Sequence, residues 1–178
     1  MMEKESGAGR SLLIIGAGGL GQEVAEMAAM RGEYDRIAFL DDDPTPDKQA
    51  QFPVVGCVAD MASFAPLFTD ALPAFGNNEA RARIRAQLAA CGCRVPCMIH
   101  PTAWVSSRAE IGAGTIIRAH AGVSWGARIG ECCLINMGAL IDHGCVIGDE
   151  SHIPMGCVVR GEVQVPPMSS FKPNEVIE

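Results

Sequence analysis

The sequence predicts an α/β unit followed by an all-β solenoid of short strands. Apolar segments of strand length alternate with helical segments over residues 11–97, and from Ile99 onward a branched aliphatic residue returns at every sixth position. The composition agrees, because the 178 residues are 48% hydrophobic but only 5% aromatic and include 20 glycines. A core of this kind must be built from Ile, Val, Leu and Ala rather than from rings.

The first half of the chain has the alternation that is typical of a parallel sheet with crossover helices. Residues 11–15 are a continuous apolar run, as in a parallel strand that is buried on both faces. Further strands are expected at 36–40, 53–56, 72–76 and 95–99, the last of them closing the sheet, and helices at 22–30 and 79–90.

The second of these helices has a recognisable start. Asn77 or Asn78 can cap it, since an Asn side chain in front of a helix accepts a hydrogen bond from a free backbone N–H. The helix also carries three arginines, which are expected at solvated positions: Arg81, Arg83 and Arg85.

The second half has a period of six without a single slip. Fourteen positions share this spacing, all of them Ile or Val except one Phe: Ile99, Val105, Ile111, Ile117, Val123, Ile129, Ile135, Ile141, Ile147, Ile153, Val159, Val165, Phe171 and Ile177. The fourth residue after each is nearly always small, and glycine recurs at the third, where a tight turn needs a positive φ. This period indicates a triangular coil with one hexad on each flat side, so fourteen hexads give between four and five coils.

Charge and apolar content exclude two classes of partner. A net charge of -7 argues against nucleic-acid binding, which needs clustered cations to displace counterions from phosphates. No apolar run approaches the roughly 18 residues that span a bilayer, and residues 1–5 lack the basic and then apolar layout of a signal peptide. The chain is therefore expected to be cytoplasmic, with neither a membrane nor a nucleic-acid partner.

The eight cysteines are expected to be reduced thiols that pack as small hydrophobic residues. Zinc sites use paired spacings such as C-x2-C, whereas Cys91, Cys93 and Cys97 lie two and four apart and Cys132 adjoins Cys133. No metal is expected.

The motif Gly16-x-Gly18-x-x-Gly21 stands between the first strand and the first helix, which is the context of a phosphate-binding turn. Glycines let the backbone approach a pyrophosphate, and the positive end of the helix favours its charge. Asp41 ends the next strand, where a ribose hydroxyl can be held. Fewer than a hundred residues precede the solenoid, so a nucleotide or nucleotide sugar is favoured over NAD. A purely structural glycine turn stays open.

Four segments carry a resemblance to a known family: Ile15-Gly16-Ala17-Gly18-Gly19, Phe39-Leu40-Asp41-Asp42, Phe75-Gly76-Asn77-Asn78-Glu79-x-Arg81, and Ile135-Asn136-Met137-Gly138-Ala139-Leu140-Ile141-Asp142-His143. With the hexads, they make residues 11–165 resemble the bacterial sugar O- and N-acetyltransferases of sialic-acid and bacillosamine biosynthesis. The resemblance implies an α/β N-terminal Rossmann-like domain, residues 1–98, followed by an all-β left-handed parallel β-helix of hexapeptide repeats, residues 99–178.

The same resemblance implies the reaction and its partners. The protein would be a homotrimer that transfers an acetyl group from acetyl-CoA to a sugar, with the amine of a nucleotide-linked amino sugar favoured as acceptor. Six residues would contact the nucleotide sugar: Gly18, Gly19 and Leu20 at the phosphate turn, Asp41 and Asp42 at the base and ribose, and Gly76 against the sugar nucleotide.

For catalysis, the resemblance implies that His143 is the general base, at the seam between two β-helices. An amine or hydroxyl acceptor must lose a proton as it attacks the thioester carbonyl, and neutral histidine suits that task near pH 7. Three further residues would serve acetyl-CoA: Asn136 would support the site, His152 would lie near the thioester, and Gly161 would allow the pantetheine arm to approach.

One position departs from the family pattern. Relatives often place an acidic residue directly after the catalytic histidine, where it orients the ring, whereas this chain has Gly144. Asp142 precedes the histidine, but consecutive residues on a strand point to opposite faces. The base is therefore expected to lack an orienting partner.

Three other functions compete with acetyl transfer. A noncatalytic trimer that binds sugar nucleotides without CoA activity is favoured by Gly144 and by a β-helix that ends soon after Gly161. A β-helical carbonic anhydrase would use His120 and His143 with zinc, but a third histidine is not at the required offset. An NAD oxidoreductase is the weakest, because no second catalytic domain is indicated.

Three more side chains have plainer interpretations. His100 is expected to be an exposed linker residue, and His120 a solvated turn residue. Trp125 lies eighteen residues before His143, so it should stack one coil away on the same side, as a wall of the site or as part of the trimer interface.

Overall fold

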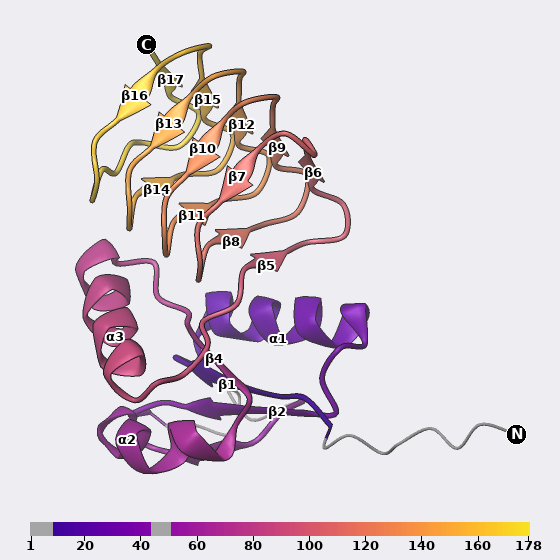
Figure 1. Ribbon diagram of the computed structural model, residues 1–178, viewed down its shortest axis with the longest axis vertical. Helices are drawn as coiled ribbons and strands as arrows, with labels where there is room; N and C mark the ends of the chain where they lie inside the picture. The colour runs from indigo at the N-terminus through magenta and orange to yellow at the C-terminus, as the bar shows by residue number, and fades with distance from the viewer. Residues whose placement is uncertain (1–8, 44–50) are drawn as a thin grey trace, which may run out of the picture.

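A computed structural model describes residues 9–43 and 51–178 of the chain. Figure 1 shows an α/β part below a stack of coils. The α/β part contains a four-stranded parallel sheet in the order β3-β2-β1-β4. Its strands are β1 (Ser11–Ile15), β2 (Arg36–Leu40), β3 (Val54–Gly56) and β4 (Asp70–Pro73). The described helices around it are α1 (Gly19–Arg31), α2 (Met61–Phe64) and α3 (Asn78–Ala90), with 3-10 turns at Val58–Asp60 and Ala65–Leu67.

Strand β1 is buried on both faces, as its continuous apolar run predicts. Leu12 and Ile14 pack in a cluster with α1, whereas Leu13 and Ile15 pack in a cluster with α2 and α3. The cluster around α1 also contains residues of the coil stack, so this helix lies between the sheet and the coils (Figure 1). Helix α1 thus packs through apolar side chains against both the sheet and the coils.

The coil stack consists of thirteen parallel strands of two residues each: β5 (Met98–Ile99), β6 (Trp104–Val105), β7 (Glu110–Ile111), β8 (Ile116–Ile117), β9 (Gly122–Val123), β10 (Arg128–Ile129), β11 (Leu134–Ile135), β12 (Leu140–Ile141), β13 (Val146–Ile147), β14 (His152–Ile153), β15 (Val158–Val159), β16 (Gln164–Val165) and β17 (Val176–Ile177). They form three sheets, in the orders β14-β11-β8-β5, β16-β13-β10-β7 and β17-β15-β12-β9-β6. Paired residues are eighteen apart, as in Leu140 and Val158. The predicted fold class, an α/β unit followed by a β-helix of hexapeptide repeats, is confirmed.

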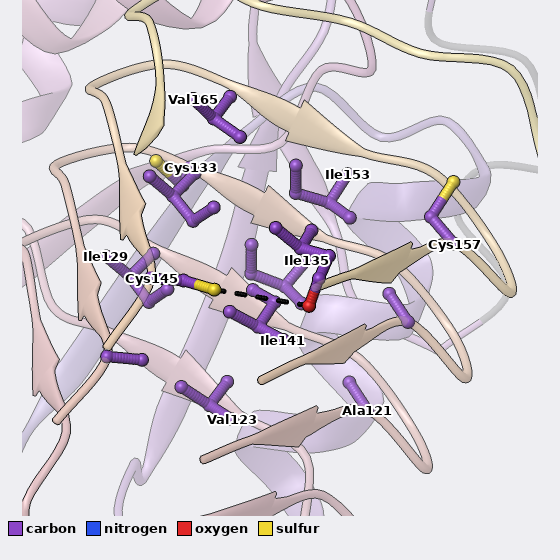
Figure 2. Close-up of a cluster of buried hydrophobic side chains, with 14 of the residues drawn as sticks. Ala121, Val123, Ile129, Cys133, Ile135, Ile141, Cys145, Ile153, Cys157 and Val165 are labelled. Carbon is purple, nitrogen blue, oxygen red and sulfur yellow. Dashed lines mark hydrogen bonds between the residues drawn. The ribbon is translucent and has the colours of Figure 1, made fainter. Parts of the chain in front are cut away.

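The second residue of nearly every strand points into the β-helix, as Figure 2 shows for Ile135 and Ile141. The small residues of the hexads fill the remaining space, and three of them are the buried cysteines Cys133, Cys145 and Cys157. Their thiols donate to backbone carbonyls of the next coil at 3.0–3.2 Å, and all eight cysteines are free. The prediction that they pack as small hydrophobic residues holds for these three.

Each turn after β7 places its third residue in the left-handed region. The glycines at this position have φ between 65° and 73°, and the other residues there have φ between 48° and 66°: His120, Cys132, Glu150, Glu162, Met168 and Asn174. The positive φ that the recurring glycines predict is therefore a property of the coil, and glycine is only its least strained occupant.

Residues 95–99 do not close the sheet, so that prediction is wrong. Met98 and Ile99 form β5, which pairs with β8 of the β-helix. The reason is register, since Ile99 occupies the first inward position of the hexads. The division at residues 98 and 99 stays a prediction. Among the described residues, no helix has the length and apolar content needed to cross a bilayer.

Candidate active site

The turn after β1 contains two kinds of glycine, those that the backbone requires and those that it does not. Gly16 has φ 103°, and a Cβ on Gly21 would lie 2.0 Å from the carbonyl oxygen of Gly16, so both are required by the backbone itself. A Cβ on Gly18 or Gly19 would meet nothing within 4 Å. A structural turn therefore explains Gly16 and Gly21 but leaves the other two without a packing reason, at the exposed start of α1.

The start of α1 has backbone N–H groups for which the helix itself supplies no acceptor. Gly18 is the N-cap residue and makes no side-chain cap, and the half-buried Leu20 follows in the first turn. The first N–H groups of a helix have no partner within it and favour an anion. Gly18, Gly19 and Leu20 thus lie where a phosphate can bind.

Asp41 and Asp42 bind backbone N–H groups of their own domain. Asp41 Oδ2 accepts from Ala17 N–H at 2.6 Å, and its Oδ1 accepts from Asp43 N–H at 2.8 Å. Asp42 Oδ1 accepts from Val58 N–H at 2.9 Å. Asp41 therefore ties the end of β2 to the glycine turn, and its contact with a ribose stays a prediction.

Gly76 lies on the loop before α3, beside a groove of about 370 Å³ that also touches Asn78 and Met168. A Cβ on Gly76 would meet nothing within 4 Å, as at Gly18. Asn77 caps α3, because its Oδ1 accepts from Ala80 N–H at 2.8 Å. The groove has one wall from each part of the chain.

Arg81 is buried, so the prediction of a solvated position is wrong for this residue. Its guanidinium donates to the carbonyl oxygens of Phe75 and Gly76 at 3.0 and 2.9 Å, and across to those of Cys132 and Glu150 at 3.0 and 2.8 Å. Burial lowers its pKa. Arg81 thus fixes the Gly76 loop against two turns of the β-helix.

Asn136 and His152 lie together near the same corner of the β-helix. Asn136 follows β11, and its Nδ2 lies 3.1 Å from Nε2 of His152, the first residue of β14. Burial lowers the pKa of His152 to about 4, with smaller contributions from the charges of Arg81 and Arg118, so the ring is neutral near pH 7. The two residues that were expected beside acetyl-CoA are in contact.

His143 lies at a different corner, in the turn after β12, and its side chain is 56% exposed. Its Nδ1 lies 2.9 Å from Oδ1 of Asp142, whose same oxygen accepts from His143 N–H at 2.7 Å. The carboxylate raises the pKa of His143. A Cβ on Gly161, one coil further on, would lie 2.6 Å from the His143 ring.

The expectation that His143 lacks an orienting partner is wrong. Strand β12 ends at Ile141, so Asp142 and His143 both belong to the turn rather than to a strand. The alternation of strand side chains does not apply there, and with Gly144 at φ 65° the carboxylate reaches its neighbour's ring. Asp142 is therefore the carboxylate that contacts the His143 ring.

The remaining predicted positions are only partly as expected. Trp125 lies at the His143 corner, where its carbonyl accepts from Gly144 N–H at 3.1 Å, and its side chain is exposed. His120 is exposed, whereas His100 is half-buried, with Nδ1 2.9 Å from Thr102 Oγ1. Among the described residues, no three His, Cys, Asp or Glu side chains are grouped to hold a metal ion.

One chain does not bring the predicted base, His143, together with Asn136 and His152, which were expected beside acetyl-CoA. Strand β12 forms the side of the triangle between Asn136 and His143, so the base and the Asn136–His152 pair lie at opposite ends of that side. Sequence reasoning also missed Arg81 and Arg118. Arg81 stands three residues before Ile84 on the apolar stripe of α3, and Arg118 stands one coil before Asn136, which are the signals that could have found them.

Comparison with known proteins identifies the family of this chain. Residues 11–88 match the family described as PglD N-terminal domain, and residues 126–161 match bacterial transferase hexapeptide repeats. The acetyltransferase domain of PglB from Neisseria gonorrhoeae FA1090 is 34% identical, over 95% of this chain and 91% of that one, with a TM-score of 0.80. The chain belongs to the bacterial sugar acetyltransferase family. The resemblance predicted from sequence is confirmed.

Two further solved structures are similar to this sugar acetyltransferase. One is a GDP-perosamine N-acetyltransferase from Caulobacter crescentus, a His-to-Ala variant in complex with CoA and GDP-perosamine, with 25% identity over 97% of this chain and 90% of that one and a TM-score of 0.83. The other is WeeI from Acinetobacter baumannii AYE, whose 18% identity over 94% of each chain and TM-score of 0.71 show the fold alone. No curated protein sequence matches the chain.

Proposed function

We propose that this protein transfers the acetyl group of acetyl-CoA to a nucleotide-linked amino sugar, with its amine as the acceptor and a sugar hydroxyl as the second choice. The observation that carries the proposal is the Asp142–His143 pair. A carboxylate only accepts hydrogen bonds, so the neutral ring keeps its proton on Nδ1 and leaves Nε2 as the base. The relatives solved with acetyl-CoA, CoA and GDP-perosamine support the two substrates.

In the proposed reaction, the acceptor nitrogen attacks the thioester carbonyl carbon and loses a proton to Nε2 of His143. The tetrahedral intermediate then expels the CoA thiolate, which takes up that proton, so His143 returns to its neutral form. The raised pKa of His143 makes it a stronger base, and Asp142 stabilises the imidazolium that forms. No other charged group is needed to balance the transfer.

The nucleotide sugar would bind on the α/β part. Backbone N–H groups of Gly18, Gly19 and Leu20 would hold the phosphates at the start of α1, and the open position of Gly76 would accept the sugar nucleotide. Asp41 and Asp42 would hold the ribose and base, a role that requires them to accept from the ligand in addition to the backbone.

The acetyl-CoA site would need a second copy of the chain. Within one copy, Asn136 and His152 lie at one corner and His143 at another, so a neighbour must bring the base to them. A homotrimer is supported by an apolar column on the sheet of β6, β9, β12, β15 and β17, where Trp104, Leu140 and Val176 are 61%, 50% and 55% exposed. Gly161 would then lie close to the pantetheine arm.

Purified protein with acetyl-CoA and UDP- or GDP-linked 4-amino sugars should release CoA in a thiol assay, and mass spectrometry should find the acetylated sugar. Calorimetry separates the main rival, because a noncatalytic module would bind the nucleotide sugar but neither bind acetyl-CoA nor release CoA. Binding of the nucleotide sugar without binding of acetyl-CoA or release of CoA would therefore contradict the proposed acetyl transfer.

A further inference from the structure

A chain of hydrogen bonds connects helix α1 of the first part to His152 in the β-helix. Glu23 Oε2 accepts from Arg118 Nε at 2.7 Å and also from its Nη2. Arg118 Nη1 donates to Asn136 Oδ1, and Asn136 Nδ2 lies 3.1 Å from His152 Nε2. Arg118 is 13% exposed and Asn136 is buried, so solvent competes little for the bond between these two side chains.

The donors along this chain determine the orientation of the Asn136 amide. Its oxygen faces two groups that can only donate, the Arg118 guanidinium and the Met137 N–H at 2.8 Å. An amide nitrogen at that place would meet both donors without an acceptor. The amide oxygen is therefore fixed toward Arg118, and the NH₂ group is fixed toward His152.

The protonation of His152 follows from this orientation. The NH₂ group of Asn136 is a donor only, so Nε2 of His152 must accept and carries no proton. A neutral imidazole then holds its proton on Nδ1, and among the described residues no hydrogen-bond partner reaches that nitrogen. His152 thus has an Nδ1–H donor available, while its Nε2 already accepts from Asn136.

We infer that Arg118 is a positioning residue which, through Asn136, holds His152 as the Nδ1–H tautomer, so that this N–H can donate to a carbonyl oxygen such as that of the acetyl-CoA thioester. The identity of that carbonyl rests on the proposed function, whereas the tautomer does not. A donor fixed in advance on a carbonyl oxygen favours the negative charge that develops there during attack. Glu23 anchors Arg118 from the helix whose first turn is the expected phosphate site.

The tautomer can be measured on the full chain without any substrate. Proton–nitrogen correlation spectra of protein with isotope-labelled histidine distinguish Nδ1–H from Nε2–H rings, and a His152→Gln variant assigns the signal. We expect wild-type His152 to be a single Nδ1–H tautomer near pH 7. Arg118→Met should give a mixture of tautomers, because only the Met137 N–H then holds the amide oxygen and the Asn136 amide can turn over in part of the molecules.

Two further variants make the test decisive. In Asn136→Asp, a carboxylate replaces the amide donor, so Nε2 of His152 must become protonated, as Nε2–H or as imidazolium. Arg160→Met removes an exposed arginine paired with Glu178 and should leave His152 unchanged. A wild-type Nε2–H ring, or an unchanged single Nδ1–H tautomer in Arg118→Met, would overturn the inference. Neither result bears on CoA release, so failure of the proposed function is recognised separately.

Discussion

His143 and His152 lie at two different corners of the β-helix, and their surroundings shift the pKa values of the two rings in opposite directions. His143 is exposed and contacts a carboxylate, which raises its pKa, whereas His152 is half-buried beside an amide, and burial lowers its pKa to about 4. Both neutral rings carry the proton on Nδ1. In His143, Nδ1 faces the Asp142 carboxylate, which can only accept, and in His152 the Asn136 NH₂ group donates to Nε2, so the proton is on Nδ1. His143 therefore leaves Nε2 unprotonated, as the proposed base requires, and His152 leaves Nδ1–H free for the proposed donor role. Opposite environments thus prepare identical side chains for different acid–base roles in the proposed reaction.

The largest expected effect tests which corner holds the base. In His143→Ala, kcat should fall by roughly 10²–10⁴-fold, since general acid–base catalysis contributes that much. His120→Ala, at an exposed turn four corners earlier, should keep wild-type activity. The measurement is CoA release at saturating substrates. Unchanged kcat in His143→Ala would remove the base from this corner.

Arg81 supports the turn just before His152, because it binds the carbonyls of Glu150 and Ser151. Arg81→Met should lower the free energy of unfolding by about 3 kcal/mol, since it leaves several buried carbonyls unpaired. Arg83→Met, on the exposed face of the same helix, should change it by less than about 0.5 kcal/mol. Urea denaturation measures both, and equal values for the two variants would contradict the structural role of Arg81.

Gly161 tests how closely the His143 ring is placed. In Gly161→Ala, the new methyl group would lie 2.6 Å from the ring, so the ring must move away from its position beside Asp142. We expect kcat to fall by about tenfold or more, because small displacements of a catalytic group are costly. The thermal unfolding midpoint should hardly change, since an exposed ring can shift into solvent. Wild-type kcat in this variant would show that the ring position is unimportant.

The sequence predicted the β-helix better than the α/β part, and the reason is physical. Each hexad repeats one requirement, an inward aliphatic residue and a small neighbour, so every position from Ile111 to Val165 could be assigned by counting. The prediction for residues 95–99 was wrong because an apolar strand has the same composition in the α/β part and in the β-helix. Only the register of Ile99 shows that it belongs to the coils.

The candidate site was predictable as residue types but not as contacts. Counting places His143 at a turn, yet the fold of that turn, which brings Asp142 to the ring, depends on backbone angles that no spacing reveals. Arg81 is similar: a charged residue is normally assigned to solvent, and only the carbonyls of a distant turn make its burial favourable. Long-range polar partners were the missing information.

The effect of the Asp142 carboxylate on the pKa of His143 should be visible in the pH dependence of kcat/KM. Asp142→Asn removes the charge that raises the pKa of His143, so the acidic limb of kcat/KM should move to lower pH while the maximum falls. Glu162→Gln should move the limb in the same direction by less, because its charge has the smallest effect on that pKa. A limb that stays in place in Asp142→Asn would mean that another group titrates.

The smallest expected effect is on stability, where the two histidines should act with opposite sign. The folded pKa of His143 lies above its ordinary value of 6.5, so its contribution is fully present below that value and is lost as pH rises through the folded pKa. The folded pKa of His152 lies near 4, so the unfolded chain takes up more protons and stability falls as pH drops from 6.5 toward 4. Between pH 7.5 and 5.5, His152→Gln should therefore lose less stability than wild type, and His143→Gln should lose more. Urea midpoints at the two pH values measure this, and shifts of the same sign in both variants would show that the two corners do not differ as their contacts indicate.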